Sequence, residues 1–227
     1  MKRIRWLSAQ WPVSLRTIAS KMKANAFTQN SFNGFLVERV RDTSIEARYI
    51  EKLTYQETLT DPFGNEEILD RVTYRQIEFG LFADFPNIEL WDSPRSTQSF
   101  VSRLLELSDF SLSVSHLQVN LLDWTEAFQG QVKRPIIIDS LQIAGLELEK
   151  GVSAKMLVKG DKDVREALDH FTEGKPYILE KLQFRVQLDR SVASIHLASN
   201  GSAKMPVEFV RDFLPSLRQS LPEPVSR

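Results

Sequence analysis

The sequence predicts an α+β protein of two modules, in which helices accompany largely antiparallel strands. One apolar pattern occurs twice, over residues 77–105 and 182–214. Each copy has two alternating apolar runs joined by a turn, then a helix-start signal and an amphipathic segment beginning at Phe100 or Phe209. A chain of 227 residues also has room for two modules with separate cores. The pattern indicates a diverged internal repeat, although apolar periodicity alone can also produce it.

Residues 1–30 are expected to form a basic helical head. Pro12 suits the first turn of a helix, where its missing N–H is not needed. Leu15, Ile18 and Met22 follow at helical spacing, and Asn25 is a plausible stop signal.

Residues 31–122 are expected to form the first, strand-rich module. Apolar residues alternate before and after a dense turn signal at residues 61–65, which predicts a long hairpin. The apolar phase shifts between Tyr74 and Ile77, which suggests a β-bulge. A helix is expected near residues 95–107 and a further strand over 112–122.

A polar stretch, residues 123–134, is the candidate linker. Residues 135–220 predict a ββαββα module with a bend at Gly145, since a strand glycine often marks a bulge. Pro215 predicts a break in the last helix near Leu214. Residues 221–227 are expected to be a flexible tail.

Charge distribution gives the main hint of a partner. The net charge is −1, yet residues 1–37 contain six basic residues and no acidic one, which leaves −7 for the remainder. We therefore expect the head to contact a partner, most simply another protein subunit. Aromatic and basic residues also interleave in the head and on the predicted hairpin, a combination that binds nucleic acid in other proteins. The candidate contact residues are Lys2, Arg3, Arg5, Trp6, Trp11, Arg16, Lys21, Lys23, Arg48, Tyr55, Arg71 and Arg75.

No motif indicates catalysis. The absence of cysteine excludes disulfides and thiolate metal sites, and the three histidines show no metal-ligand spacing. No phosphate-binding glycine loop is present, and we expect no cofactor. Asp169 with Glu173 and Lys175 is the nearest match to a nuclease pattern, but its position at a helix end favours a surface charge cluster.

The sequence therefore favours a non-enzymatic binding or assembly subunit of a larger intracellular complex. A nucleic-acid-binding module is the first alternative, and a metal-dependent hydrolase with dispersed carboxylates is the second. No apolar run reaches the length of a spanning helix, so we expect no membrane partner and a cytoplasmic location.

Overall fold

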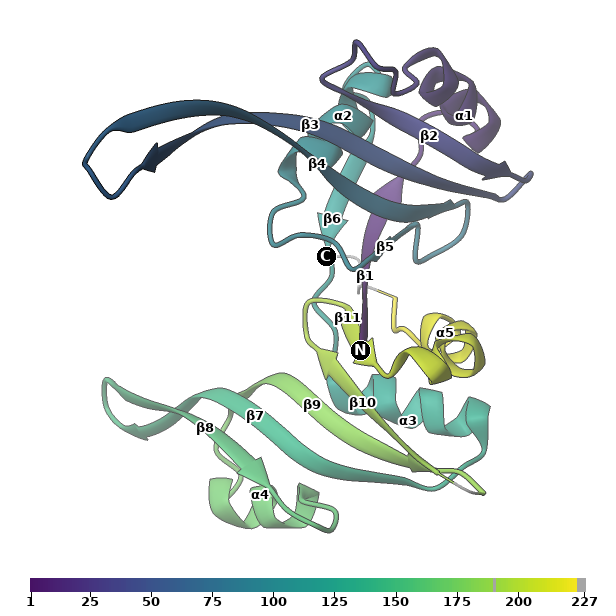
Figure 1. Ribbon diagram of the computed structural model, residues 1–227. Coiled ribbons are helices and arrows are strands. Elements are labelled where there is room, and N and C mark those ends of the chain that lie inside the picture. The colour runs from purple at the N-terminus through teal and green to yellow at the C-terminus, as the bar shows by residue number, and fades with distance from the viewer. Residues whose placement is uncertain (190, 224–227) are drawn as a thin grey trace. The chain divides into compact units, whose positions relative to one another are not determined.

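The fold is known from a computed structural model that describes residues 1–189 and 191–223 (Figure 1). The chain divides into two compact units. Unit 1 comprises residues 1–8 and 115–227, and unit 2 comprises residues 9–114. The α+β class is confirmed, because five α-helices and eleven strands lie in the described part and the strands within each unit pair antiparallel.

In unit 2, four strands form a meander in the order β2-β3-β4-β5. Two helices accompany this sheet, and their C-terminal ends approach one another. The elements are α1 (Leu15–Ala24), β2 (Asn33–Val40), β3 (Ser44–Thr60), β4 (Glu66–Phe82), β5 (Ile88–Trp91) and α2 (Gln98–Leu107).

The core of unit 2 is a chain of aromatic rings between this sheet and α2. The ring of Phe100 in α2 lies 4.7 Å from that of Phe79 in β4 and 5.9 Å from that of Tyr49 in β3. Phe35 of β2 extends the cluster at 6.2 Å from Phe79. Burial, followed by the nearby charge of Glu51, raises the pKa of Tyr49 to about 12.

In unit 1, the strand order is β1-β11-β10-β9-β7-β8, and neighbouring strands are antiparallel. Strands β1 and β6 each cross the boundary between the two units. The elements are β1 (Lys2–Gln10), β6 (Ser113–His116), α3 (Leu121–Val132), β7 (Ile136–Glu149), β8 (Val152–Lys159), α4 (Arg165–Thr172), β9 (Ile178–Gln187), β10 (Val192–Ala198), β11 (Ser202–Met205), a 3-10 turn (Val207–Phe209) and α5 (Val210–Gln219).

Helices α3 and α5 pack together over one face of this sheet (Figure 1). Phe128 of α3 contacts Phe184 of β9 at 5.6 Å and Phe213 of α5 at 5.8 Å, measured between ring centroids. Trp124 packs edge-on against Trp6, and its indole N–H donates to the carbonyl of Leu217 at 3.0 Å. These contacts bury a large apolar area, which is the main stabilising contribution to a unit of this size.

Several local expectations agree with the structure. Asn25 caps α1, residues 61–65 close the long hairpin, and the β7–β8 register shifts around Gly145, whose φ of +70° suits glycine. Other segments differ. Residues 2–10 of the expected helical head form a strand, and the expected linker at 123–134 is largely helix α3, whose N-cap Asn120 accepts two backbone N–H groups.

Three further expectations are wrong. The β3–β4 register shows no bulge near Tyr74, because the phase change marks the point where β4 leaves the core. Helix α5 continues through Pro215, held by the buried side chains of Phe213 and Leu217. Only residues 113–116 of the expected 112–122 strand pair as a strand. Of the expected tail, Leu221 is buried, and residues 224–227 lie outside the described part.

Candidate functional site

A two-stranded arm projects from the sheet of unit 2 (Figure 1). Strand β2 pairs with β3 only as far as Glu51, and β5 pairs with β4 only from Glu78 onward. Between these limits, β3 and β4 have only each other as ladder partners in the part of the chain that the structure describes. We call residues 52–74 the hairpin arm. A ribbon of two strands is marginal in water by itself, so such an arm needs a reason to persist.

The hairpin arm exposes large apolar side chains on both of its faces. Alternation along the strands sends Tyr55 and Leu59 to one face and Ile68, Val72 and Tyr74 to the other. At the tip, Phe63 is 90% exposed. Isolated exposed apolar residues are common, but the concentration of six on one projecting element indicates an interaction surface. This set is the candidate functional site.

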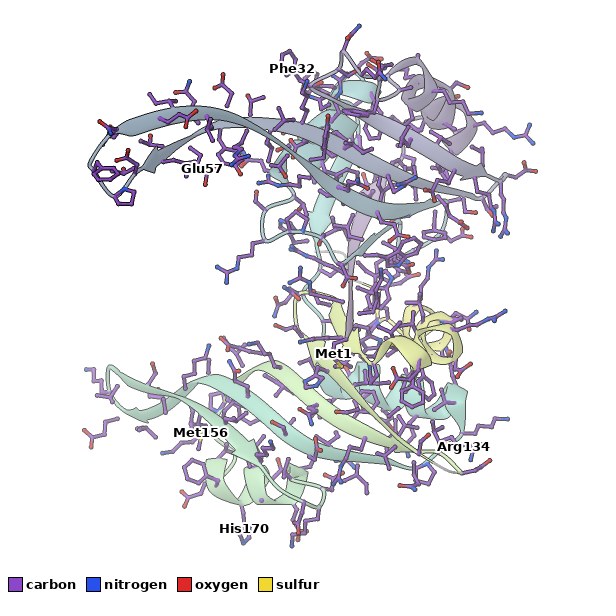
Figure 2. The ribbon with its side chains drawn as sticks, viewed as in Figure 1. Met1, Phe32, Glu57, Arg134, Met156 and His170 are labelled. Atoms are coloured by element: carbon purple, nitrogen blue, oxygen red, sulfur yellow. The ribbon has the colours of Figure 1, made fainter. Side chains whose placement is uncertain are left out.

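The tip of the arm is strongly acidic. Glu57, Asp61, Glu66, Glu67 and Asp70 lie between residues 57 and 70, a stretch that contains no lysine or arginine. Figure 2 labels Glu57 on this arm. Hydrogen bonds from the side chain and backbone of Asn65 lower the pKa of Asp61, so the turn keeps its negative charge.

Cross-strand pairs hold the base of the arm. Glu57 accepts from the Arg71 guanidinium at 2.7 Å, and Arg75 lies 3.6 Å from Glu51. At the same level as the Glu57–Arg71 pair, but on the other face, the Gln56 amide donates to Asp70 at 3.2 Å. Pairs of this kind contribute only about 0.2–1 kcal/mol each at exposed positions. They fix the register of the arm without covering its apolar residues.

The predicted hairpin contacts are therefore partly brought together. Tyr55 and Arg71 are direct cross-strand partners on one face, and Arg75 lies two positions along β4 on the same face. Arg48 points to the opposite face, where it donates to Glu38 at 2.6 Å. Each of these three arginines has an acidic partner, so the set does not form a free cationic platform.

The head residues of β1 have different environments. Trp6 is fully buried in the core of unit 1, so its ring cannot stack on a ligand. Arg3 and Arg5 project from the other side of β1, and Lys2 is partly buried. Arg5 donates to the Nδ1 atom of His116 at 3.1 Å, and burial followed by the charge of Arg3 lowers the pKa of Arg5.

The head residues of α1 and its approach lie in unit 2. Trp11 donates its indole N–H to the carbonyl of Phe82 at 2.8 Å, which is a structural contact. Arg16 pairs with Asp42 through its Nε at 3.2 Å, and Lys23 is exposed.

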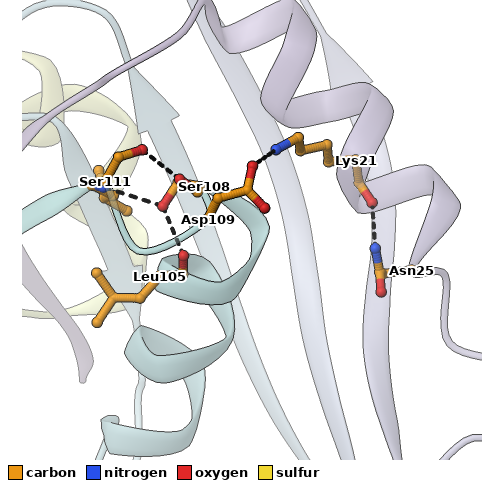
Figure 3. Close-up of polar contacts among 7 residues, drawn as sticks. Lys21, Asn25, Leu105, Ser108, Asp109 and Ser111 are labelled. Carbon is orange, nitrogen blue, oxygen red and sulfur yellow. Dashed lines mark hydrogen bonds and ion pairs between the residues drawn. The ribbon is translucent and has the colours of Figure 1, made fainter.

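Lys21 belongs to a polar network that links the C-terminal ends of α1 and α2 (Figure 3). Its ammonium lies 2.8 Å from Asp109, and its carbonyl accepts from the Asn25 amide at 2.9 Å. Arg103 donates to the Asn25 side-chain oxygen at 2.8 Å and also pairs with Glu106. An open hollow of about 270 Å³ lies here, but its charged groups pair with one another, so the network serves to join the two helices.

The exposed apolar residues at the tip, Phe63 and Ile68, were not among the predicted contacts. The signal that could have found them is the dense turn flanked by strands too long for one sheet, with apolar residues in the phase opposite to Ile77. Within the described residues, no group of three His, Asp or Glu side chains is arranged to hold a metal ion. In that same part of the chain, no helix combines the length and apolarity that crossing a membrane requires.

No protein-family model matches the chain, and no curated protein is significantly similar to it in sequence.

Proposed function

We propose that this protein is a non-enzymatic binding or assembly subunit of a larger intracellular complex, and that the hairpin arm is the element that enters a partner protein. The observation that carries the proposal is the exposure of apolar residues on both faces of the arm and at its tip. A projecting hairpin without core contacts gains little from its own fold. Its apolar residues would become buried, and so stabilising, once a partner encloses them.

The partner we propose is a protein with an apolar pocket bordered by lysine or arginine. Phe63 would fill the pocket, since a large aromatic side chain is a common anchor of interfaces. The acidic residues around it would pair with the basic border and steer the approach. Because Arg16 and Lys21 on α1 already pair with acids of the same chain, the arm supports this proposal better than the basic head does.

We also propose that the two units descend from one repeated plan. Both contain a helix, three antiparallel strands that are neighbours in the sheet, and a second helix: α1, β3-β4-β5, α2 in unit 2, and α3, β7-β9-β10, α5 in unit 1. Each set of three strands has one more strand at its outer edge: β2 beside β3 in unit 2, and β8 beside β7 in unit 1. Because β2 precedes β3 in the chain whereas β8 follows β7, we propose that these edge strands were added after the duplication.

A cytoplasmic location is part of the proposal. The absence of cysteine suits a reducing compartment, where disulfides could not contribute to stability. A metal-dependent hydrolase is the least supported of the alternatives, because no convergent group of carboxylates among the described residues motivates it.

The test is affinity capture from the native host with the full chain. The variant Phe63→Ser with Ile68→Ser removes apolar area at the tip without changing charge. The matched control is Phe171→Ser, at an exposed phenylalanine of α4 in unit 1. We expect a stoichiometric partner with the wild type and the control, and its loss with the tip variant.

Charge reversal at the tip distinguishes the electrostatic contribution to partner association from the contribution of burying apolar side chains. Glu66→Lys with Glu67→Lys should slow association and lower its salt dependence, because it removes attraction at the rim of the contact. If the tip variant retains the same partner at the same stoichiometry, the arm is not the binding element and the proposal is wrong.

A further inference from the structure

A second surface, on unit 1, is dominated by positive charge. The strands β9, β10, β11 and β1 turn alternate residues toward α3 and α5, among them Phe184, Ile195 and Ile4. The residues between them project from the opposite face of the sheet. We call this face the cationic face, and its members are Arg3, Arg5, Lys181, Gln183, Arg185, Ser194, His196, Ser202 and Lys204.

The sheet register arranges these residues in rows across the strands. In one row, Gln183 pairs with His196, His196 with Lys204, and Lys204 with Arg3. The neighbouring row runs from Lys181 through Ala198 and Ser202 to Arg5. Adjacent strands are about 4.8 Å apart, and next-but-one residues on a strand are about 6.7 Å apart. The first row therefore places a hydrogen-bond donor on each of four strands, and the second does so on three, because Ala198 has no polar side chain.

This arrangement does not favour the stability of the sheet. Lys204 and Arg3 are directly opposite one another, and like charges in that position are destabilising. Burial, followed by the charge of Lys204, lowers the pKa of His196, while Asp139 acts in the opposite direction. Burial is thus the main reason that the imidazole disfavours a proton, and the charge of Lys204 adds to it.

Two acidic groups border the face. Glu180 pairs with Lys155 and interacts with the charge of Lys181, whereas Asp139 orients the arginine beside it. Asp139 is buried in β7, where its Oδ2 atom lies 3.0 Å from the Arg185 Nε and accepts from the Gln183 amide at 3.4 Å. The Arg185 guanidinium also donates to the carbonyl of Asp161 at 2.6 Å. These contacts fix the orientation of Arg185, and the exposed Lys181 and Lys204 extend the charge across the sheet.

We propose that the cationic face of unit 1 binds the phosphate backbone of nucleic acid. Rows of lysine, arginine and neutral donors match a chain of regularly spaced anionic oxygens better than they match a single anion. The rows include no Phe, Tyr or Trp side chain, so binding depends mainly on phosphates rather than on base stacking, and it tolerates changes in the nucleotide sequence. The site is separate from the hairpin arm and does not depend on the function proposed for it.

Fluorescence anisotropy tests this with the full chain and a labelled 20-nucleotide single strand, alongside the corresponding duplex. The variant Arg3→Gln, Lys181→Gln, Lys204→Gln removes three charges from the face. The control variant Lys150→Gln, Lys175→Gln, Arg211→Gln removes three exposed charges elsewhere in unit 1. We expect the face variant to weaken binding at least tenfold and to reduce the slope of log K against log salt by about 2–3, since each phosphate contact contributes about 0.7–0.9. The control and the arm variant Phe63→Ser, Ile68→Ser should bind like the wild type.

A second variant guards against loss of folding. Lys204→Glu places an acid opposite Arg3, so it should raise the unfolding midpoint of unit 1 while it weakens nucleic-acid binding. His196 gives an independent readout: bound phosphate should favour its protonation, so wild-type affinity should rise from pH 8 to pH 6, and His196→Gln should abolish that rise.

The relative affinities for single strand and duplex identify which form the face prefers, and binding of either supports the proposal. Equal losses in the face and control variants would mean that only net charge matters, and would overturn it. So would the absence of binding at low salt, or tighter binding of poly-glutamate than of either oligonucleotide.

Discussion

Phe100 and Phe209 occupy matching places in the repeated sequence pattern, which predicts equal importance for their helices. In the structure their environments differ. Phe100 is fully buried in α2, whereas Phe209 lies in the 3-10 turn before α5 and is only partly buried. Phe213, one turn after Phe209, is buried together with Leu217 in that helix. Replacing each of the three with alanine therefore separates sequence position from burial.

The expected magnitudes follow from these contacts. Phe100→Ala removes a ring that contacts Phe79 and Tyr49, and truncating a buried phenylalanine costs about 3–5 kcal/mol of unfolding free energy. Phe213→Ala should cost a similar amount through its contact with Phe128. Phe209→Ala should cost only about 1 kcal/mol, as for a typical point mutation. With a urea m-value of about 2 kcal/mol/M, a loss of 4 kcal/mol shifts the midpoint by about 2 M.

Urea unfolding can be monitored by hydrogen exchange and mass spectrometry, which measure the protection of each unit separately. Phe100→Ala should lower protection in residues 9–114, and Phe213→Ala should lower it in residues 115–223. Because the two sites lie in different units, their effects should add in the double variant. A midpoint shift below about 0.5 M for Phe100→Ala, or a larger loss from Phe209→Ala than from Phe213→Ala, would refute the packing described here.

Three further predictions concern the arm, a close approach and a titration. Replacing residues 54–72 with Asn-Gly, which closes a two-residue hairpin, should leave the free energy of unfolding of unit 2 within about 0.5 kcal/mol of the wild type, because the deleted residues lie outside the core. A large loss of this free energy in urea unfolding would show that the arm supports the fold. Gly34→Ala should cost about 1–3 kcal/mol in the same assay, because its Cβ would lie 2.6 Å from a backbone nitrogen of the preceding loop. The pKa of His196, which faces Lys204 and Asp139, is lowered in the folded state. It therefore makes a contribution to stability that is present above about pH 6.5 and is lost as the pH falls through the folded-state pKa. Between pH 7.5 and 5 the melting temperature should fall less for His196→Gln than for the wild type, and an equal fall would contradict the assignment.

Local sequence signals determined those elements that are specified by interactions between residues close together in the chain. Helix α1 has apolar residues at helical spacing and a capping asparagine, the long hairpin has a dense turn signal, and the β7 bend has a glycine with positive φ. In each of these, the deciding interactions lie within a few residues. Helix α3 could also have been found, because Leu121, Trp124 and Phe128 form an apolar stripe, but its polar content resembled a linker.

Tertiary structure decided what depends on distant partners. Residues 2–5 become a strand because β11, about 200 residues later, supplies the ladder, and this pairing buries Trp6 while it brings Arg3 beside Lys204. The phase change near Tyr74 cannot be assigned from sequence, because whether an apolar residue faces a core or solvent depends on where the neighbouring strands end. The cationic face likewise exists only through register, since its lysines and arginines are scattered along the chain and only strand pairing places them in rows.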